Sequence, residues 1–172
     1  DFSVSGKIKV RNASFSIKNE GDVVCLLGPS GIGKTTVLRS IAGLEKVQNG
    51  TIELNNKTLS SKNINIDPEN RNISLAFQEN SLFPHYTIEK NILLGAERKK
   101  NNKEKKISLK ELVDLLDISH ILNKFPHQVS AGEAQRASLA RSLVSEPDLL
   151  LLDEPLSNID QSFKEEIQVR LK

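Results

Sequence analysis

The sequence has little of several residue types, and each scarcity narrows what the protein can be. Its 172 residues include one cysteine and no methionine or tryptophan. A single cysteine cannot form an internal disulfide, which fits an intracellular reducing compartment. No apolar run approaches the roughly 18 residues that a membrane span needs, and no signal-like segment opens the chain. The length suffices for one domain with a sizeable core but not for two.

Net charge is also scarce. The chain has 24 lysines and arginines against 22 aspartates and glutamates, a formal net charge of +2, which gives no indication of a nucleic-acid partner. The excess is local, because residues 97–106 carry six positive and two negative charges. A run of this kind is usually a solvated surface, and a partner-binding patch is the alternative. Since a natural chain normally begins with methionine, Asp1 suggests a piece of a longer protein.

The pattern of apolar residues predicts strands alternating with helices. Alternation predicts short strands at 7–10 and 14–17, and the continuous apolar run 22–27 is typical of a strand buried on both faces. Cys25 lies in that run and is expected to be an inert core residue. Further strands are expected at 51–54, 73–77 and 148–152, and helices at 34–44, 87–94, 109–116, 130–144 and 163–171. This order predicts a parallel α/β core with a mostly helical insertion at about 81–130.

A phosphate-binding loop is the strongest motif. Residues 28–35 read GPSGIGKT and match G-x-x-x-x-G-K-[ST] at every fixed position, between a predicted buried strand and a predicted helix. Glycines allow a tight turn whose N–H groups point at phosphate oxygens, and the helix adds its positive N-terminal end. Lys34 is expected to reach the β- and γ-phosphates, and the Thr35 hydroxyl to bind Mg²⁺. The expected nucleotide-binding residues here are Gly28, Pro29, Ser30, Gly31, Ile32, Gly33, Lys34, Thr35 and Thr36.

An acidic pair follows the most apolar predicted strand. Four leucines precede Asp153 and Glu154. In open α/β sheets ligands bind at the carboxyl ends of the strands, the same edge as the phosphate loop. Asp153 is expected to hold Mg²⁺, and Glu154 to orient and polarise the attacking water. The alternative is a pair that merely caps the next helix, where Pro155 favours a helix start.

With the phosphate loop, the acidic pair and three further motifs, the chain resembles the ATP-binding subunits of ABC transporters along nearly its whole length. Phe77-Gln78 resembles the Q-loop, residues 129–136 (VSAGEAQR) resemble the signature, and residues 157–160 (SNID) resemble the D-loop. The resemblance implies that Gln78 contacts Mg²⁺ and the attacking water. It further implies that the signature residues of one copy, and Asp160, serve the ATP of a second copy. The signature residues are Ser130, Ala131, Gly132 and Glu133.

The resemblance also implies a fold. The fold is a P-loop NTPase core, in which helices flank a parallel sheet, with an N-terminal antiparallel β-subdomain and an inserted helical subdomain. Residues 1–172 then form a single ATP-binding domain that is incomplete at its C-terminus, because the family's switch histidine lies beyond the D-loop and all three histidines here precede Asp153. Ala131 replaces a glycine of the signature, and the stretch 3–6 lacks the aromatic residue expected to stack on adenine.

The function that the resemblance implies is ATP hydrolysis that powers solute import. The expected cofactors are ATP and Mg²⁺, and the expected partners are a second copy in a head-to-tail dimer, transmembrane permease subunits and, indirectly, an extracytoplasmic solute-binding protein. The subunit would lie peripherally on the cytoplasmic face of the cell membrane. Residues 125–128 (FPHQ) favour the ferric-iron group of importers.

Two other functions remain open at this point. One is a nucleotide-binding fragment without turnover of its own. The other is an ABC-type ATPase of chromosome maintenance or DNA repair, which the short distance from Gln78 to Ser130 argues against. Leu82, Phe83 and Tyr86 form an apolar cluster that is either ordinary core or the contact with the membrane subunit.

Overall fold

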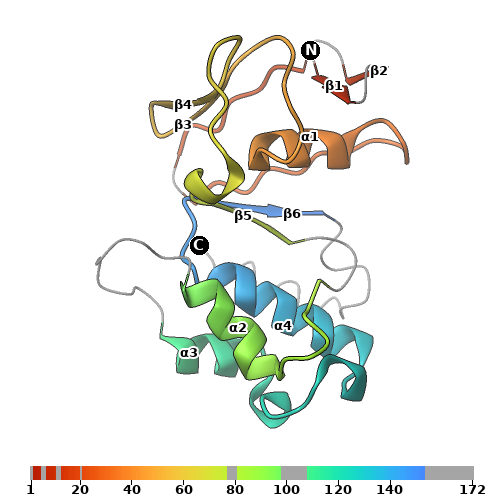
Figure 1. Cartoon of the computed structure of the whole chain (residues 1–172), viewed down its shortest axis with the longest axis vertical. Coiled ribbons are helices and arrows are strands. Elements are labelled where there is room, and N and C mark those ends of the chain that lie inside the picture. Colours follow the sequence, from red (N-terminus) through yellow and green to blue (C-terminus); the bar gives the residue numbers. More distant parts are fainter. Residues whose placement is uncertain are drawn as a thin grey trace. The chain divides into compact units, whose positions relative to one another are not determined.

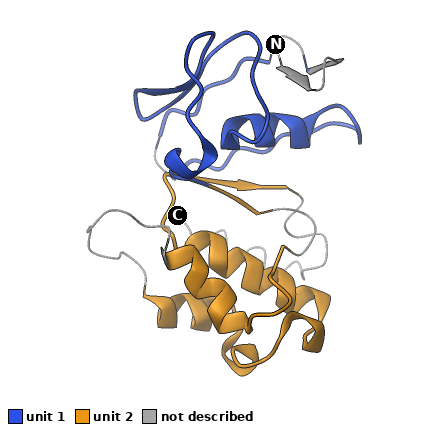
Figure 2. Ribbon diagram, viewed as in Figure 1, with its two compact units in different colours: residues 1–73, 171–172 blue, residues 74–170 orange. Residues whose placement is uncertain are grey.

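The chain folds into two compact units, which are described separately. The computed structural model describes residues 2–4, 7–10, 13–19, 21–76, 81–97 and 108–153. Unit 1 comprises residues 1–73 with 171–172, and unit 2 comprises residues 74–170 (Figure 2). No helix among the described residues is long and apolar enough to cross a membrane.

Unit 1 contains two antiparallel hairpins and one α-helix. The hairpins pair β1 (Phe2–Val4) with β2 (Lys7–Val10), and β3 (Ile52–Leu54) with β4 (Lys57–Ser60) (Figure 1). Helix α1 spans Lys34–Ala42, and the short 3-10 helix η1 spans Pro68–Asn70. The predicted strands at 7–10 and 51–54 and the predicted helix at 34–44 are confirmed in position.

Glycines set both ends of α1. Gly33 precedes the helix with φ 104° and Gly43 follows it with φ 87°, a left-handed conformation that few other residues adopt. The inner face of the helix contributes Val37 to a small core with Val47. The half-buried side chains that pack against this core are Val10, Leu26, Ile41 and Ile52.

The predicted strands at 14–17 and 22–27 are wrong in the described structure, where both segments are irregular. Val23 and Leu27 are 67% and 90% exposed, and Cys25 is exposed, not buried in a core. A strand buried on both faces needs hydrogen-bonded neighbours on both sides. Among the described residues no strand pairs with 22–27. Within 22–27 only Leu26 is partly buried, against the core around Val37.

Unit 2 combines a two-stranded sheet with helices. Its elements are β5 (Ile73–Ala76, whose first residue belongs to unit 1), α2 (Ile88–Glu97), α3 (Leu109–Leu115), the 3-10 helices η2 (Ser119–Ile121) and η3 (Pro126–Gln128), α4 (Ala131–Leu143) and β6 (Leu149–Leu152) (Figure 1). Strands β5 and β6 are neighbours. The N–H of Asp153, just after β6, donates to the carbonyl oxygen of Ala76 at the end of β5. The carboxyl ends of the two strands therefore meet, as in a parallel pair.

Helices α2 and α4 pack closely in unit 2. A Cβ atom at Gly95 of α2 would overlap the carbonyl oxygen of Arg141 in α4, so only glycine permits this approach. The fully buried apolar side chains of the unit are Ile88, Ile92, Leu112, Leu116, Ile118, Ile121, Ala137 and Ala140. The helices expected at 87–94, 109–116 and 130–144 and the strand at 148–152 are confirmed, and the predicted subdomain boundaries at 81 and 130 stay a prediction.

Candidate nucleotide site

The phosphate loop lies in unit 1 and leads directly into α1. Gly31 has φ 81° and Gly33 has φ 104°, so glycine is required at both turns of the loop. The Nζ of Lys34 donates to the carbonyl oxygens of Gly28 and Pro29, at 2.8 and 3.0 Å. The structure thus brings the Lys34 ammonium to the first two residues of the loop.

The arrangement suits an anion. No side chain caps the start of α1, because its N-cap residue is Gly33. Helices α3 and α4 differ, since a serine side chain caps the first turn of each. A helix start of this kind presents backbone N–H groups and the positive end of the helix dipole. With the ammonium of Lys34 beside it, the loop has the donors and the charge that a polyphosphate requires.

The opposite end of α1 is held by a buried arginine that the sequence analysis did not identify. Arg71 is 2% exposed, and its guanidinium makes five hydrogen bonds. Nη1 donates to the carbonyl oxygens of Ser40 and Ile41, and Nε to that of Ile66. Nη2 donates to Ser60 and Asn65. Burial lowers the pKa of Arg71, and the charge of Asp67 opposes this shift.

The five hydrogen bonds equal the number of guanidinium N–H groups, and every acceptor is a neutral oxygen. The clamp joins the last turn of α1 to β4 and to the segment around Ile66. The sequence contains only one weak signal of this clamp, which is the position of Arg71 directly between a turn that begins with proline and an apolar strand.

The acidic pair is described only in part. Asp153 follows β6 in unit 2, at the carboxyl ends of β5 and β6, where the sequence placed it. Glu154, Gln78 and Asp160 lie outside the described residues, as do the predicted helix at 163–171 and most of the lysine-rich run. Among the residues that the structure describes, no cluster of three or more histidine, cysteine or acidic side chains could hold a metal ion.

The signature residues form the N-terminus of α4 in unit 2. Ser130 is the N-cap, Ala131 and Gly132 are the first two helical residues, and Glu133 is the third. The Oγ of Ser130 accepts from the N–H of Glu133 at 3.2 Å, and the N–H of Ser130 donates to Oε2 of Glu133 at 2.7 Å. This is a complete capping box, in which serine and glutamate satisfy each other's backbone groups.

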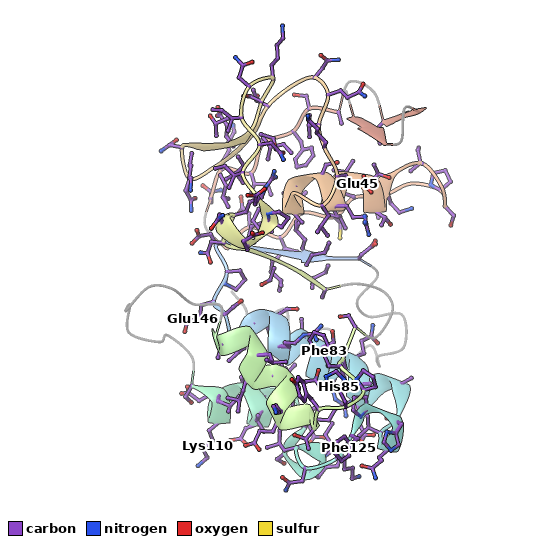
Figure 3. All side chains as sticks on the ribbon, in the orientation of Figure 1. Glu45, Phe83, His85, Lys110, Phe125 and Glu146 are labelled. Carbon is purple, nitrogen blue, oxygen red and sulfur yellow. The ribbon has the colours of Figure 1, made fainter. Side chains whose placement is uncertain are left out.

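An exposed aromatic surface lies in unit 2 between the predicted Q-loop and α2. Leu82 is buried, whereas Phe83 is 45% exposed. The Phe83 ring lies beside that of His85 (Figure 3). It also forms an edge contact with the ring of Tyr86. Lys90 lies over the ring of Tyr86, at 4.2 Å from its centre. Leu82 is thus in the core and Phe83 at the surface, and a contact of this cluster with the membrane subunit stays a prediction.

This loop is held from beneath by two polar side chains. Asn91 is fully buried. Its side-chain amide forms hydrogen bonds with the backbone of Phe83, Tyr86 and Thr87. Arg141 of α4 donates to the carbonyl oxygen and the hydroxyl of Ser81, at 2.9 and 2.6 Å. The exposed rings are thus presented on a fixed backbone.

The family model described as ABC transporter matches residues 10–157, which include the phosphate loop, the signature and the acidic pair. The chain belongs to the ABC transporter family. It is 41% identical over 166 residues to the Fe(3+) ions import ATP-binding protein FbpC of Fusobacterium nucleatum, covering 96% of this chain and 43% of that protein. It is 37% identical over 172 residues to the sn-glycerol-3-phosphate import ATP-binding protein UgpC of Brucella abortus, covering 99% of this chain and 48% of that protein.

A solved structure of the same family has the same fold. The dimeric post-hydrolysis state of the ATP-binding cassette MJ0796 bound to ADP and Pi superposes with a TM-score of 0.77 at 28% identity, covering 95% of this chain and 72% of that one. The expected ABC ATPase fold and the expected likeness to ferric-iron importers are therefore confirmed. The chain spans about half the length of the curated relatives that it matches.

Proposed function

We propose that this chain binds ATP and hydrolyses it to ADP and phosphate, as the ATP-binding subunit of a solute importer. One observation carries the proposal: the ammonium of Lys34 lies in a glycine loop that opens α1, in a chain of the ABC transporter family. The relatives named as import ATP-binding proteins support the transport role.

Each predicted site residue then has a chemical task. Lys34 exchanges its bonds to the carbonyl oxygens of Gly28 and Pro29 for bonds to the β- and γ-phosphates. Thr35, Asp153 and Gln78 are the residues that would supply oxygen ligands to Mg²⁺, and the ion would neutralise charge on those phosphates. Glu154 accepts a proton from the water that attacks the γ-phosphorus, and the bond to the β-phosphate oxygen breaks.

A second copy completes the site in this proposal. Ser130, Ala131, Gly132 and Glu133 at the start of α4, with Asp160, face the γ-phosphate bound by the other copy, so that two chains enclose two ATP molecules head to tail. The dimeric structure of the MJ0796 cassette with ADP and Pi supports the pairing of two copies. ATP binding joins the copies and hydrolysis separates them.

The membrane partners are the permease subunits, with the solute-binding protein acting indirectly, and the chain works on the cytoplasmic face of the cell membrane. The rigid aromatic loop around Phe83 supports a docking role, since exposed rings on a fixed backbone suit a protein partner. The FbpC relative supports ferric iron as the solute.

Phosphate release by Glu154→Gln tests the proposal. The variant keeps the size of the side chain and removes the base, so turnover should fall by roughly 100-fold or more while the Kd for ATP changes less than about twofold. Asp148→Asn, at the amino end of the strand that leads to the acidic pair, is the control and should retain turnover. Unchanged phosphate release in Glu154→Gln would refute the assigned base.

A further inference from the structure

The N-terminus of α4 already binds an anion of the same chain, the carboxylate of Glu133. Oε2 of Glu133 accepts from the N–H of Ser130 at 2.7 Å and from the Oγ of Ser130 at 2.8 Å. Both donors are thereby directed to the Glu133 carboxylate. In the proposed function the same end of α4 has to face a phosphate.

The second oxygen of this carboxylate is held by a residue from another element. Nε2 of His120, in η2, lies 2.8 Å from Oε1 of Glu133. Because an ionised carboxylate only accepts hydrogen bonds, Nε2 carries the proton in this contact. His120 is half exposed, whereas the Glu133 side chain is 19% exposed. Both oxygens of the Glu133 carboxylate are therefore hydrogen-bonded, one to Ser130 at the helix end and the other to the imidazole of His120.

The hydrogen bonds keep Glu133 negatively charged. Bonds from Ser130, first from its backbone and then from its hydroxyl, lower the pKa of Glu133 to about 2, with a further contribution from His120. A second anion brought to the same helix end meets like charge at short range, and the repulsion opposes its binding.

We propose that His120 and Glu133 control access to the signature, because their contact holds the Glu133 carboxylate across Ser130 and closes the start of α4 to phosphate. Glu133 has to rotate away from Ser130 before this end can meet the nucleotide of a second copy. His120 is a positioning residue that acts only through Glu133. The inference rests on the proposed function for the role of the opening, but the closure itself belongs to the single chain.

A matched control exists within the same unit. Ser108 and Glu111 form the same capping box at the start of α3, with Oε2 of Glu111 at 2.8 Å from both the N and the Oγ of Ser108. Glutamine at the third position keeps the size of the side chain, removes the charge and replaces the charge-assisted hydrogen bonds from serine by weaker neutral ones, which a phosphate can displace. Glu133→Gln and Glu111→Gln therefore remove the same charge from the same motif, at and away from the signature.

The first experiment titrates the full chain with inorganic phosphate and follows the backbone amide signals by NMR. In Glu133→Gln, the signals of residues 130–133 should shift saturably at millimolar phosphate, while the wild-type chain and Glu111→Gln show no shift there. Absence of a shift in Glu133→Gln would overturn the closure, whatever its effect on dimerisation.

The second experiment measures ATP-driven dimerisation by sedimentation, in the Glu154→Gln background so that ATP persists. Glu133→Gln should lower the dimer Kd by about tenfold or more relative to Glu111→Gln. His120→Ala should lower it less, and should add nothing once Glu133→Gln is present. An equal effect of His120→Ala in both backgrounds would contradict a role through Glu133.

The two experiments separate the inference from the function on which it rests. If phosphate shifts the amide signals of residues 130–133 in Glu133→Gln but no variant dimerises with ATP, the closure stands and the head-to-tail dimer is wrong. If all variants dimerise alike and phosphate shifts none of them, the dimer stands and the closure is wrong.

Discussion

The Nη1 of Arg71 donates to the carbonyl oxygen of Ser40 at 3.1 Å, in the last turn of the helix that Lys34 begins. One helix therefore has an ammonium at its anion-binding start and a guanidinium at its end, where the exposed carbonyls and the negative pole of the dipole lie. The second cation is buried and fully hydrogen-bonded, so its role is to fix the helix.

Arg71→Ala should destabilise unit 1 by about 3–5 kcal/mol, because it leaves several buried oxygens without a donor and opens a cavity. Arg71→Lys should recover only part of this loss, since an ammonium cannot reproduce the guanidinium fork. Urea unfolding measures both variants. Arg39→Ala is the control, because Arg39 forms a partly exposed pair with Glu45 at 3.2 Å that should contribute less than about 1 kcal/mol. Equal losses for Arg71→Ala and Arg39→Ala would contradict the clamp.

Asn91→Ala should loosen the aromatic loop before α2, because the amide of Asn91 bonds three backbone positions of that loop. Its Oδ1 also accepts from the N–H of Phe83 at 2.7 Å. We expect a loss of about 1–3 kcal/mol and faster hydrogen exchange at the Phe83 amide. Substituting the exposed Asn123 provides the control. Unchanged protection of the Phe83 amide would show that the loop is held by other contacts.

Much of the fold could be predicted where local signals determine the element. The glycine loop placed α1 within a residue of its observed start at Lys34, and helical spacing located α3 around Leu112. The segment 22–27 could not be predicted in the same way. Its apolar composition indicates burial, but burial depends on partner strands, and Leu27 is exposed in the described structure.

The pH dependence of stability should report the capping box of α4. Since the pKa of Glu133 is lowered to about 2, the unfolded chain binds its proton more readily than the folded chain. The charge therefore contributes stability that is complete above about pH 4.5 and is lost as the pH falls toward 2. Thermal unfolding of the wild-type chain and of Glu133→Gln measures this, and their difference should shrink over that range. A constant difference would contradict the lowered pKa.

The candidate site was predictable only as far as its motifs are contiguous. The loop around Lys34 and the position of Asp153 after an apolar strand follow from short patterns with a clear chemical reason. The contact of His120 with Glu133 joins residues 13 apart through a 3-10 turn and a loop, a spacing that no helix or strand period brings together. The burial of Arg71 could not be predicted, because arginine is ordinarily exposed and its burial here depends on carbonyl groups that only the fold assembles.

Titration of ATP against Lys34→Ala tests the central claim most directly. The ammonium of Lys34 lies 2.8 Å from the Gly28 carbonyl oxygen in the phosphate loop, so its loss should raise the Kd for ATP by roughly 100-fold or more. Lys46→Ala, which removes an exposed lysine from the same unit, should bind as the wild-type chain does. If Lys34→Ala bound ATP with the wild-type Kd, the phosphate loop would not be the nucleotide site.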